Sequence, residues 1–513
     1  MSKKQKRGTN CCVIVFILWC ALVSGIHAQD FGFGFDEDAG ENAPKPAVSV
    51  KVGGEIAAEF TGYVHDFSSK EEAKAASLGD MVSGALNFSA SGANVDAFIG
   101  LNLSAASIGG LAALTENPAA TPLILDEVFL RVYFGPVNVE AGYRKLGWGK
   151  ADSFGPLDII NPLDYTDLTN ISDIQAVKIA RPMVHITWNA GGFSKLEGVF
   201  IPNFTGHRFA REGPWAPAQY STMTEVIEAE VLNRLSPMMA LIPPQYASAI
   251  QDMYTRSVAG FSPEFPGTSA LEYFQTGLRF TTTVGPADIG AQYFYGSLFR
   301  PDVIFPVDTF VEDLIKKNLP LFTSPSPDLS NLYAGDTALL YKIKYNRYHQ
   351  LGIDYAQVLF GLNVRAECAI HLTEDLRGDD GSVRNPFIGW SLGFDRDLFW
   401  GINANVQCNE TIRLFNGKVG DNPLLDCEAD TNVTSTRITM QLSKKFLRDE
   451  LETRAIVIWD IEDAGCYIIP SVMWTIKDVT AELSAGVFAG KESGELGQYW
   501  ENSFVRLGLK YSF

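Results

Sequence analysis

Hydrophobic and polar residues alternate one by one along much of this chain, which is the period of a β-strand. The alternation is strict at the carboxyl end, where Arg506, Gly508, Lys510 and Ser512 are interleaved with Leu507, Leu509, Tyr511 and Phe513. Taken alone, such a stretch also fits an ordinary amphipathic edge strand. A long apolar edge is prone to aggregate in water. The alternative is a strand that closes a barrel whose outer face meets lipid.

The same pattern recurs and predicts an all-β fold, a transmembrane antiparallel up-and-down β-barrel of 16–18 strands. The first segment, from 48 to 64, is longer than most strands of globular proteins and suits a tilted membrane strand. The predicted strands lie near 48–64, 82–92, 95–105, 123–135, 137–146, 182–189, 193–201, 271–284, 287–298, 340–356, 358–372, 385–394, 398–414, 431–444, 449–461, 465–476, 479–490 and 498–513.

The predicted connections alternate between short and long. Tight turns follow the even-numbered strands, at Gly92–Asn94, Gly135-Pro136, Ala190–Gly192, Gly285-Pro286, Asp395–Asp397 and Lys477-Asp478. Longer connections follow the odd-numbered strands, near 66–81, 106–122, 147–181, 202–270, 299–339, 373–384 and 415–430. Outer-membrane barrels sort their turns and loops in this way, whereas a soluble sandwich has no reason to. An even strand count predicts that both termini lie on the periplasmic side.

The facing of the strands can be predicted from energetic cost. Turning segment 358–372 over would place Arg365 in hydrocarbon, at roughly 2–4 kcal/mol at the bilayer midplane. Segment 398–414 likewise places Asn403, Asn405, Gln407 and Asn409 inside, with Trp400 on the outer face. A ring this large cannot be filled by side chains, so its interior is expected to be wet. Outward aromatics near the tight turns predict an interfacial girdle: Phe134, Trp188, Tyr355, Phe394, Trp400, Trp474 and Phe513.

Charged residues at inward positions are the candidate pore lining. Acidic residues dominate the first strands and arginines dominate the second half of the chain. Two hypotheses follow: facing walls of opposite charge that create a transverse field, or charge ladders that stiffen the wall. The predicted pore-lining residues are Glu55, Glu59, Asp96, Glu127, Arg131, Glu140, Arg144, Arg365, Arg437 and Arg454.

Three long connections, 147–181, 202–270 and 299–339, need their own interpretation. The first either folds into the lumen and narrows it, with its Asn-Pro-x-Asp turn as an anchor, or lies outside over the rim. Helical spacing predicts a helix from Thr222 to Leu235, through Val226, Ile227 and Val231. A second short helix is predicted from Asp308 to Asn318. We expect these helices to pack on each other in the loops instead of serving as partner-binding elements.

The amino-terminal part reads as export and leader segments. A basic stretch, an apolar run and a small residue before the cut site predict a signal peptide over 1–28. Residues 29–46 are acidic and Gly-rich, which predicts a flexible leader. The barrel would then occupy 47–513. Loss of four positive charges takes the net charge from −19 to −23, which argues against a nucleic-acid partner. Cys368, Cys408, Cys427 and Cys466 lack CxxC spacing and are expected to be free, although pairing stays possible.

Two stretches resemble known proteins. Arg506, Gly508, Tyr511 and Phe513 resemble the carboxyl-terminal assembly signal of bacterial outer-membrane barrels, which implies recognition by the barrel-assembly machinery. The hairpin with Gly142-Tyr143-Arg144, Trp148-Gly149 and Asn161-Pro162-Leu163-Asp164 resembles an uncharacterised family of Gram-negative outer-membrane porin-like barrels. Segments 196–204 and 348–355 fit as well. This resemblance implies a barrel in the bacterial outer membrane and names no transported molecule.

No enzyme motif stands out, because G-x-S-x-G, P-loop and HExxH sequences are all missing and the histidines are dispersed. We therefore expect no catalytic residues, no cofactor and no metal. The favoured function is a passive or weakly selective pore for small hydrophilic solutes. The alternatives are a fatty-acid-type transporter plugged by Phe31, Phe33 and Phe35, and a surface-exposed interaction protein on a barrel anchor. Expected partners are outer-membrane lipid, the assembly machinery and small solutes, and a homo-oligomer is possible.

Overall fold

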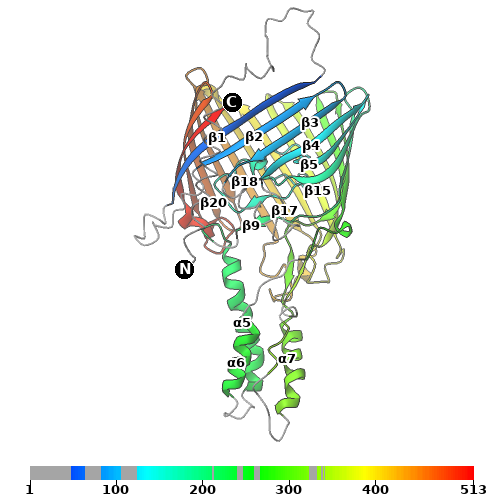
Figure 1. Ribbon diagram of the computed structural model, residues 1–513, viewed down its shortest axis with the longest axis vertical. Helices are drawn as coiled ribbons and strands as arrows, with labels where there is room; N and C mark the ends of the chain where they lie inside the picture. Colours follow the sequence, from blue (N-terminus) through cyan, green and yellow to red (C-terminus); the bar gives the residue numbers. More distant parts are fainter. Residues whose placement is uncertain are drawn as a thin grey trace, which may run out of the picture.

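Eighteen antiparallel strands form one closed barrel in the computed structural model, which describes residues 48–63, 82–104, 124–210, 213–239, 247–258, 266–322, 332–336, 339 and 341–513 (Figure 1). Each strand pairs with the next along the chain. The last strand, β22 (Phe504–Ser512), pairs with the first, β1 (Ser49–Tyr63), from Tyr63 opposite Phe504 to Glu55 opposite Ser512. The predicted all-β barrel and its upper strand count are confirmed.

The wall is completed by sixteen further strands, all close to predicted segments. They are β2 (Val82–Ser91), β3 (Val95–Asn102), β4 (Leu125–Phe134), β5 (Val137–Arg144), β7 (Arg181–Asn189), β8 (Lys195–Ile201), β10 (Gln275–Val284), β11 (Ala287–Ser297), β14 (Arg347–Leu359), β15 (Leu362–Thr373), β16 (Phe387–Asp397), β17 (Ile402–Arg413), β18 (Thr434–Phe446), β19 (Leu451–Asp460), β20 (Gly465–Ile476) and β21 (Val479–Ala489).

Several boundaries differ from the prediction. Segment 271–284 was placed too early, because Leu271–Tyr273 forms a 3-10 turn and β10 begins at Gln275. The predicted turn Asp395–Asp397 is wrong, because these residues end β16. Segment 340–356 was placed too early: Lys342–Lys344 forms β13 in a separate small sheet with β12 (Asp302–Ile304), and β14 runs on to a turn at Phe360-Gly361. The last strand starts late because residues Gly497–Asn502 form a 3-10 turn. Trp400 was predicted on a strand but lies in the 3-10 turn Phe399–Gly401.

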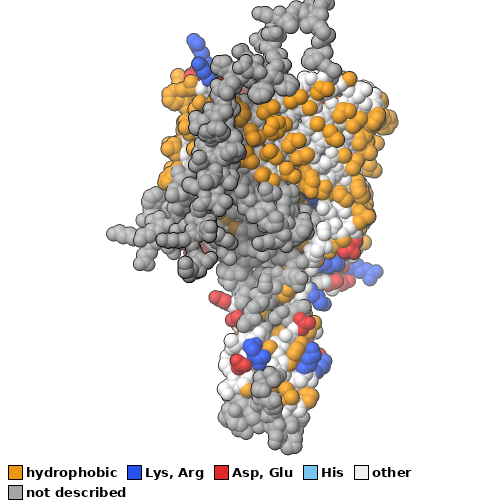
Figure 2. All heavy atoms as spheres, in the orientation of Figure 1, with side chains coloured by type: hydrophobic (Ala, Val, Ile, Leu, Met, Phe, Trp, Pro, Cys, Tyr) orange, Lys and Arg blue, Asp and Glu red, His pale blue; other side chains and the backbone are white. Residues whose placement is uncertain are grey.

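The two faces of the wall differ in chemistry, as the alternation predicts. On β14, Leu351 and Ile353 are exposed on the outside while Gln350 and Asp354 are buried inside. Figure 2 shows a broad apolar surface on the face of the barrel that is in view, with the charged side chains in view gathered toward its ends and on the projection below. Outward aromatics near the short turns, such as Trp188, belong to this surface.

Short turns lie at one end of the barrel and long connections at the other (Figure 1). Ser49 pairs with Ser91 beside a short turn, and the Ser512 amide donates to the carbonyl of Asp478 in another, at 2.8 Å. The described wall therefore begins and ends at the short-turn end. No helix among the described residues is long and apolar enough to cross a bilayer.

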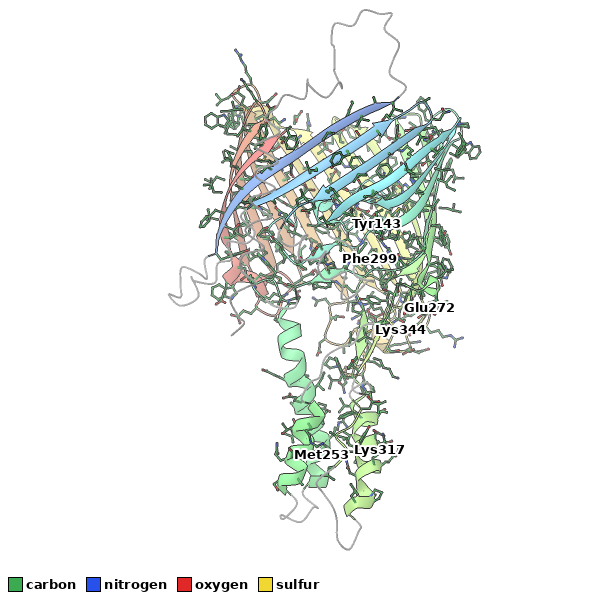
Figure 3. All side chains as sticks on the ribbon, viewed as in Figure 1. Tyr143, Met253, Glu272, Phe299, Lys317 and Lys344 are labelled. Carbon is green, nitrogen blue, oxygen red and sulfur yellow. The ribbon has the colours of Figure 1, made fainter. Side chains whose placement is uncertain are left out.

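Three helices project from the long-connection end (Figures 1 and 3). They are α5 (Ala218–Met239), α6 (Ala247–Val258) and α7 (Val307–Phe322), and the two predicted helices lie within α5 and α7. Ile227, Val231 and Leu235 of α5 pack against a buried cluster that includes Phe310 and Leu314 of α7. The expected packing of loop helices on each other is confirmed, except that Val226 is exposed.

Several predictions lie outside the described residues. They are the signal peptide 1–28, the flexible leader 29–46 and the plug formed by Phe31, Phe33 and Phe35. Four cysteines follow the predicted signal peptide, and the structure describes all of them as free thiols: Cys368, Cys408, Cys427 and Cys466.

Candidate functional site

The connection between β5 and β7 crosses the inside of the barrel. Those two strands are neighbours in the wall, but residues 146–180 between them contact β11, β14, β15 and β17, and farther round the ring β20 and β22. The contacts are made with inward-facing side chains, such as Glu367 and Gln407. Of the two hypotheses for this segment, folding into the lumen is confirmed and a loop over the rim is wrong. We call residues 146–180 the internal loop.

Glu367 of β15 anchors the first part of the internal loop. Its carboxylate accepts hydrogen bonds from the amides of Lys150 and Ala151, the second at 2.6 Å, with Leu157 at 3.4 Å. The side chain is buried, so these amides supply the partners that a carboxylate needs inside a protein. Gly149 permits the approach, because its φ is +100° and a Cβ there would lie 2.3 Å from the Glu367 Oε1.

Three glutamines of the wall hold the next part of the internal loop. Gln292 donates to the carbonyl of Leu157 at 3.0 Å, and Gln350 donates to the carbonyl of Pro156 at 2.6 Å. On the other side, Gln407 accepts from the amide of Asp152 at 2.7 Å. Amide side chains both donate and accept, so they can satisfy a loop backbone that has left the sheet.

Asn161 joins the two ends of the internal loop. Its amide donates to the carbonyls of Arg144 and Ile179, at 2.9 and 2.8 Å, and its oxygen accepts from the amide of Leu146 at 2.7 Å. The anchoring role predicted for the Asn-Pro-x-Asp turn is therefore confirmed for Asn161. Arg181, fully buried at the start of β7, adds bonds to the carbonyls of Ile160 and Asn203.

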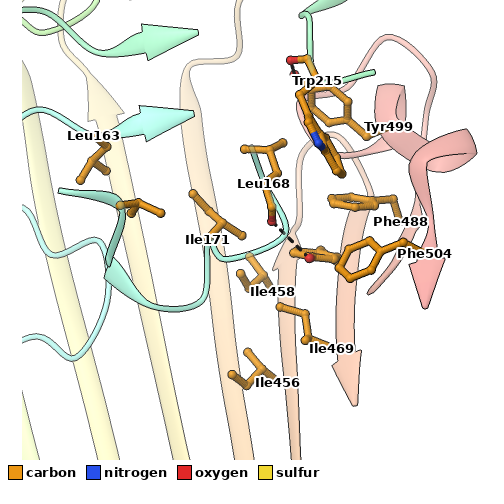
Figure 4. Packing of buried hydrophobic residues seen from close by; sticks show 12 residues of the cluster. Leu163, Leu168, Ile171, Trp215, Ile456, Ile458, Ile469, Phe488, Tyr499 and Phe504 are labelled. Carbon is orange, nitrogen blue, oxygen red and sulfur yellow. Dashed lines mark hydrogen bonds between the residues drawn. The ribbon is translucent and has the colours of Figure 1, made fainter. Parts of the chain in front are cut away.

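The far part of the internal loop packs against an apolar patch on the inner wall (Figure 4). Leu168 and Ile171 lie in one cluster with Ile458, Tyr467 and other inward side chains of β19 to β22. The Tyr467 hydroxyl donates to the carbonyl of Leu168 at 3.2 Å. The internal loop is thus fixed at its base, its middle and its far part.

All ten predicted pore-lining residues have a charged or hydrogen-bonding partner. In the first half, Arg131 and Arg144 both pair with Glu140, at 2.5 and 3.2 Å. Pairs that involve these residues include Glu55–Lys510, Glu59–Arg506, Asp96–Tyr133, Glu127–Arg144, Arg131–Glu140, Arg365–Asp152, Arg365–Asp395, Arg437–Asp460, Arg437–Glu495 and Arg454–Glu452.

The positions of these pairs show which of the two hypotheses for the inward charges fits better. Most lie between neighbouring strands or on one strand, and the arginines of the second half meet carboxylates nearby. Such an arrangement fits the ladder hypothesis better than two unpaired walls of opposite charge. Arg365 is an exception in one respect, because it also binds Asp152 of the internal loop at 2.6 Å.

One ion cluster links opposite sides of the long-connection end. Arg300 follows β11 and Glu495 precedes β22, half a ring away, yet their side chains meet at 3.0 Å. Glu495 also binds Arg437 at 3.0 Å. The positive charge of Arg437, followed by that of Arg300, lowers the pKa of Glu495 to about 2 despite partial burial. A charged bridge therefore crosses the interior here.

His207 belongs to a second inward segment, which follows β8. Residues Arg208–Phe209 form β9 and pair in parallel with β6 (Asp164–Tyr165) of the internal loop. The His207 Nδ1 accepts from the amide of Leu163 at 2.9 Å. Burial lowers the pKa of His207 to about 3, so the ring is neutral.

The residues that hold the internal loop were not singled out as site residues from the sequence. Gln407 was predicted to face inward, Glu367 lies on the same face of segment 358–372 as Arg365, and Gln350 lies in segment 348–355, which entered only through the family resemblance. For Gln350 the sequence carries a signal, an inward glycine two residues later, because a Cβ on Gly352 would lie 2.2 Å from Leu157. Glu367 and Gln407 have no such glycine beside them. Among the described residues, no group of three or more His, Cys, Asp or Glu is placed to hold a metal ion.

No family model matches this sequence, and no curated protein does. Solved structures of similar shape include OccK3 (OpdO) of Pseudomonas aeruginosa, at 8% identity over 90% of this chain and 95% of that one, with a TM-score of 0.43. OccAB3 of Acinetobacter baumannii follows at 9% identity, 90% and 99% coverage and a TM-score of 0.40. The outer membrane channel DcaP of the same organism is similar at 10% identity, 92% and 99% coverage and a TM-score of 0.37.

Proposed function

We propose that this protein is a porin-like channel of the bacterial outer membrane that lets small hydrophilic solutes diffuse passively, with weak selectivity. The observation that carries the proposal is the internal loop, fixed across a polar barrel interior. A closed ring of eighteen strands leaves space that its own side chains cannot fill. The loop occupies part of that space, and we infer that it narrows the bore enough to favour small solutes.

The exterior supports the membrane part of the proposal. A closed barrel satisfies every backbone hydrogen bond of the wall, so it can present an apolar surface to lipid. The short turns at the end that holds both ends of the described wall would face the periplasm, and the long connections would face outward. In this orientation the ten paired pore-lining residues meet the solute stream.

A liposome-swelling assay tests the proposal. Proteoliposomes should swell in arabinose, more slowly in glucose, and hardly at all in raffinose, since the internal loop limits the size of the bore. Liposomes reconstituted with heat-denatured protein are the control. Equal swelling with native and denatured protein would contradict passive diffusion.

A second candidate function is that of a surface-exposed interaction protein, and the helical projection favours it. Val226, Leu232 and Leu319 are exposed apolar residues on α5 and α7. If the projection binds matrix proteins, replacing these three residues by serine should reduce binding to an immobilised matrix protein and leave swelling rates unchanged. Unchanged binding would remove this candidate.

A further inference from the structure

Inward-facing side chains differ in exposure from one side of the barrel to the other. On β8 and β14 the side chains of Glu197 and Asp354 are 8% and 0% exposed. On β1 the side chains of Glu55 and Glu59 are 43% and 42% exposed. An inward side chain of a closed barrel gains such exposure from water inside the barrel. A wet part of the lumen therefore lies along β1.

The course of the internal loop explains this difference. Its anchors lie on β11, β14, β15 and β17, and its far part reaches Tyr467 of β20 and Arg506 of β22. Beside β1 (Figure 1), Asn87 of β2 and Asn102 of β3 point inward like Glu55 and are exposed as well. We call the inward side of β1 to β4 the open face.

Arginine and carboxylate charges do not cancel where the open face meets β22. Arg506 lies 4.0 Å from Glu59 and 3.7 Å from Glu482, and it donates to the Asn170 Oδ1 of the internal loop at 2.8 Å. One guanidinium thus faces two carboxylates, and Glu59 is the more exposed of the two. Glu59 therefore presents negative charge to the water beside it.

Asp96 of β3 adds to this negative charge. It accepts from the neutral hydroxyl of Tyr133 at 2.5 Å, whereas Arg131, which lies opposite it on β4, pairs with Glu140 instead. No lysine or arginine among the described residues lies within ion-pair distance of Asp96. An inward carboxylate without a cation makes the local potential more negative.

The internal loop carries carboxylates of its own. Asp167 and Asp173 are exposed, and each accepts from backbone amides of the loop, at 2.8 and 3.0 Å. On the open face, Lys51 near the short-turn end of β1 offsets one of these negative charges, and Lys510 is paired with Glu55 at 3.3 Å. The wet part of the lumen therefore has an acidic surplus.

From exposure and charge together we propose that solutes pass along the open face and that this path favours small cations over anions. Glu59 and Asp96 are the residues that set the preference. Carboxylates that line a narrow aqueous passage raise the local concentration of cations and lower that of anions. The inference rests on the proposed channel function and assigns its solute class.

The reversal potential in a KCl gradient across a planar bilayer measures the preference. The wild type should show a higher permeability for K⁺ than for Cl⁻. Glu59→Gln and Asp96→Asn should each lower the permeability ratio by roughly 2- to 10-fold at low salt, since one charge about 5 Å from the path contributes about that much in water. An anion preference of the wild type would overturn the proposal.

Asp252→Asn is the matched control for these variants. Asp252 is an exposed carboxylate on α6, in the helical projection outside the barrel, so its loss should leave the ratio unchanged. Wild-type ratios in both Glu59→Gln and Asp96→Asn would overturn the role of these residues. An equal change in Asp252→Asn would overturn it too, because the preference would then not arise on the open face.

Cysteine labelling tests the position of the path without any current. Asn87→Cys on the open face should react with a trimethylammonium methanethiosulfonate reagent in proteoliposomes, and Ser391→Cys, at a buried inward position of β16, should not. Added mass on the intact protein is the readout, and the wild type with its four native thiols gives the baseline. Labelling of Ser391→Cys, or no labelling of Asn87→Cys, would overturn the path.

The bilayer separates this inference from the channel proposal. Current steps without cation preference would refute the selectivity and leave the channel intact. A silent bilayer would refute the channel and the selectivity together.

Discussion

Removal of the Glu367 carboxylate should release the internal loop. In Glu367→Ala the amides of Lys150 and Ala151 lose their acceptor while the barrel wall is unchanged. Hydrogen bonds to a charged group contribute about 1.5–3 kcal/mol each, so two of them stabilise the docked loop by roughly 3–6 kcal/mol. Undocking should then become about 150- to 20,000-fold more frequent.

Hydrogen exchange measures this directly. Amides from 146 to 160 should exchange faster in Glu367→Ala by that factor, and the open-channel current should become larger and noisier. In Glu367→Gln these amides should exchange faster than in the wild type and slower than in Glu367→Ala, because glutamine keeps one acceptor oxygen and loses the charge. Glu374→Ala is the control, since the pair that Glu374 forms within the described part of the chain is an exposed one with Lys344, just beyond β15. Unchanged exchange of the loop amides in Glu367→Ala would refute the anchoring role.

Three other predictions concern the same elements. Gly149→Ala should loosen the internal loop at least as much as Glu367→Ala does. The residue has φ +100°, and the added Cβ would collide with Glu367. Hydrogen exchange of the loop amides checks this. His207 has a folded pKa of about 3 against 6.5 when unfolded, so its contribution to stability should be full above pH 6.5 and should be lost as the pH falls from 6.5 to 3. Thermal unfolding of His207→Asn should therefore depend less on pH between 3 and 6.5. Phe310→Ala leaves a cavity at a fully buried site and should destabilise the helical projection by about 3–5 kcal/mol. The effect should be seen as faster proteolysis of α5 and α7 while the barrel stays folded. Val226→Ala, at an exposed position, is the control and should have no effect.

The wall could be predicted from the sequence because its inward and outward faces carry side chains of opposite polarity. Arg365 and Gln407 cannot be turned to lipid, so the alternation fixed the facing of their strands as well as their positions. The boundaries that were wrong lie where local structure interrupts the pattern. Lys342–Lys344 alternates like a strand of the wall but pairs elsewhere, and Trp400 adopts a left-handed turn conformation with φ 62°.

The path of the internal loop could not be predicted because its anchors are far apart in the sequence. Glu367 lies more than 200 residues from the amides that donate hydrogen bonds to it, and no local pattern distinguishes it from any other inward carboxylate. The anchoring role of Asn161 could be predicted, because its hydrogen-bond partners lie close to it in the sequence and the Asn-Pro-x-Asp turn is recognisable there. A cavity lined by His371, Arg384 and Phe387 is formed by four strands and four connections together, so only the three-dimensional arrangement reveals it.

Ion conductance of the purified protein in a planar bilayer tests the central claim most directly. A water-filled barrel narrowed by a fixed internal loop predicts stepwise current increases of uniform size, and larger steps for Glu367→Ala. A silent bilayer, with folded protein shown to be inserted, would contradict a continuous aqueous path. Steps of identical size in the two proteins would contradict the narrowing by the loop.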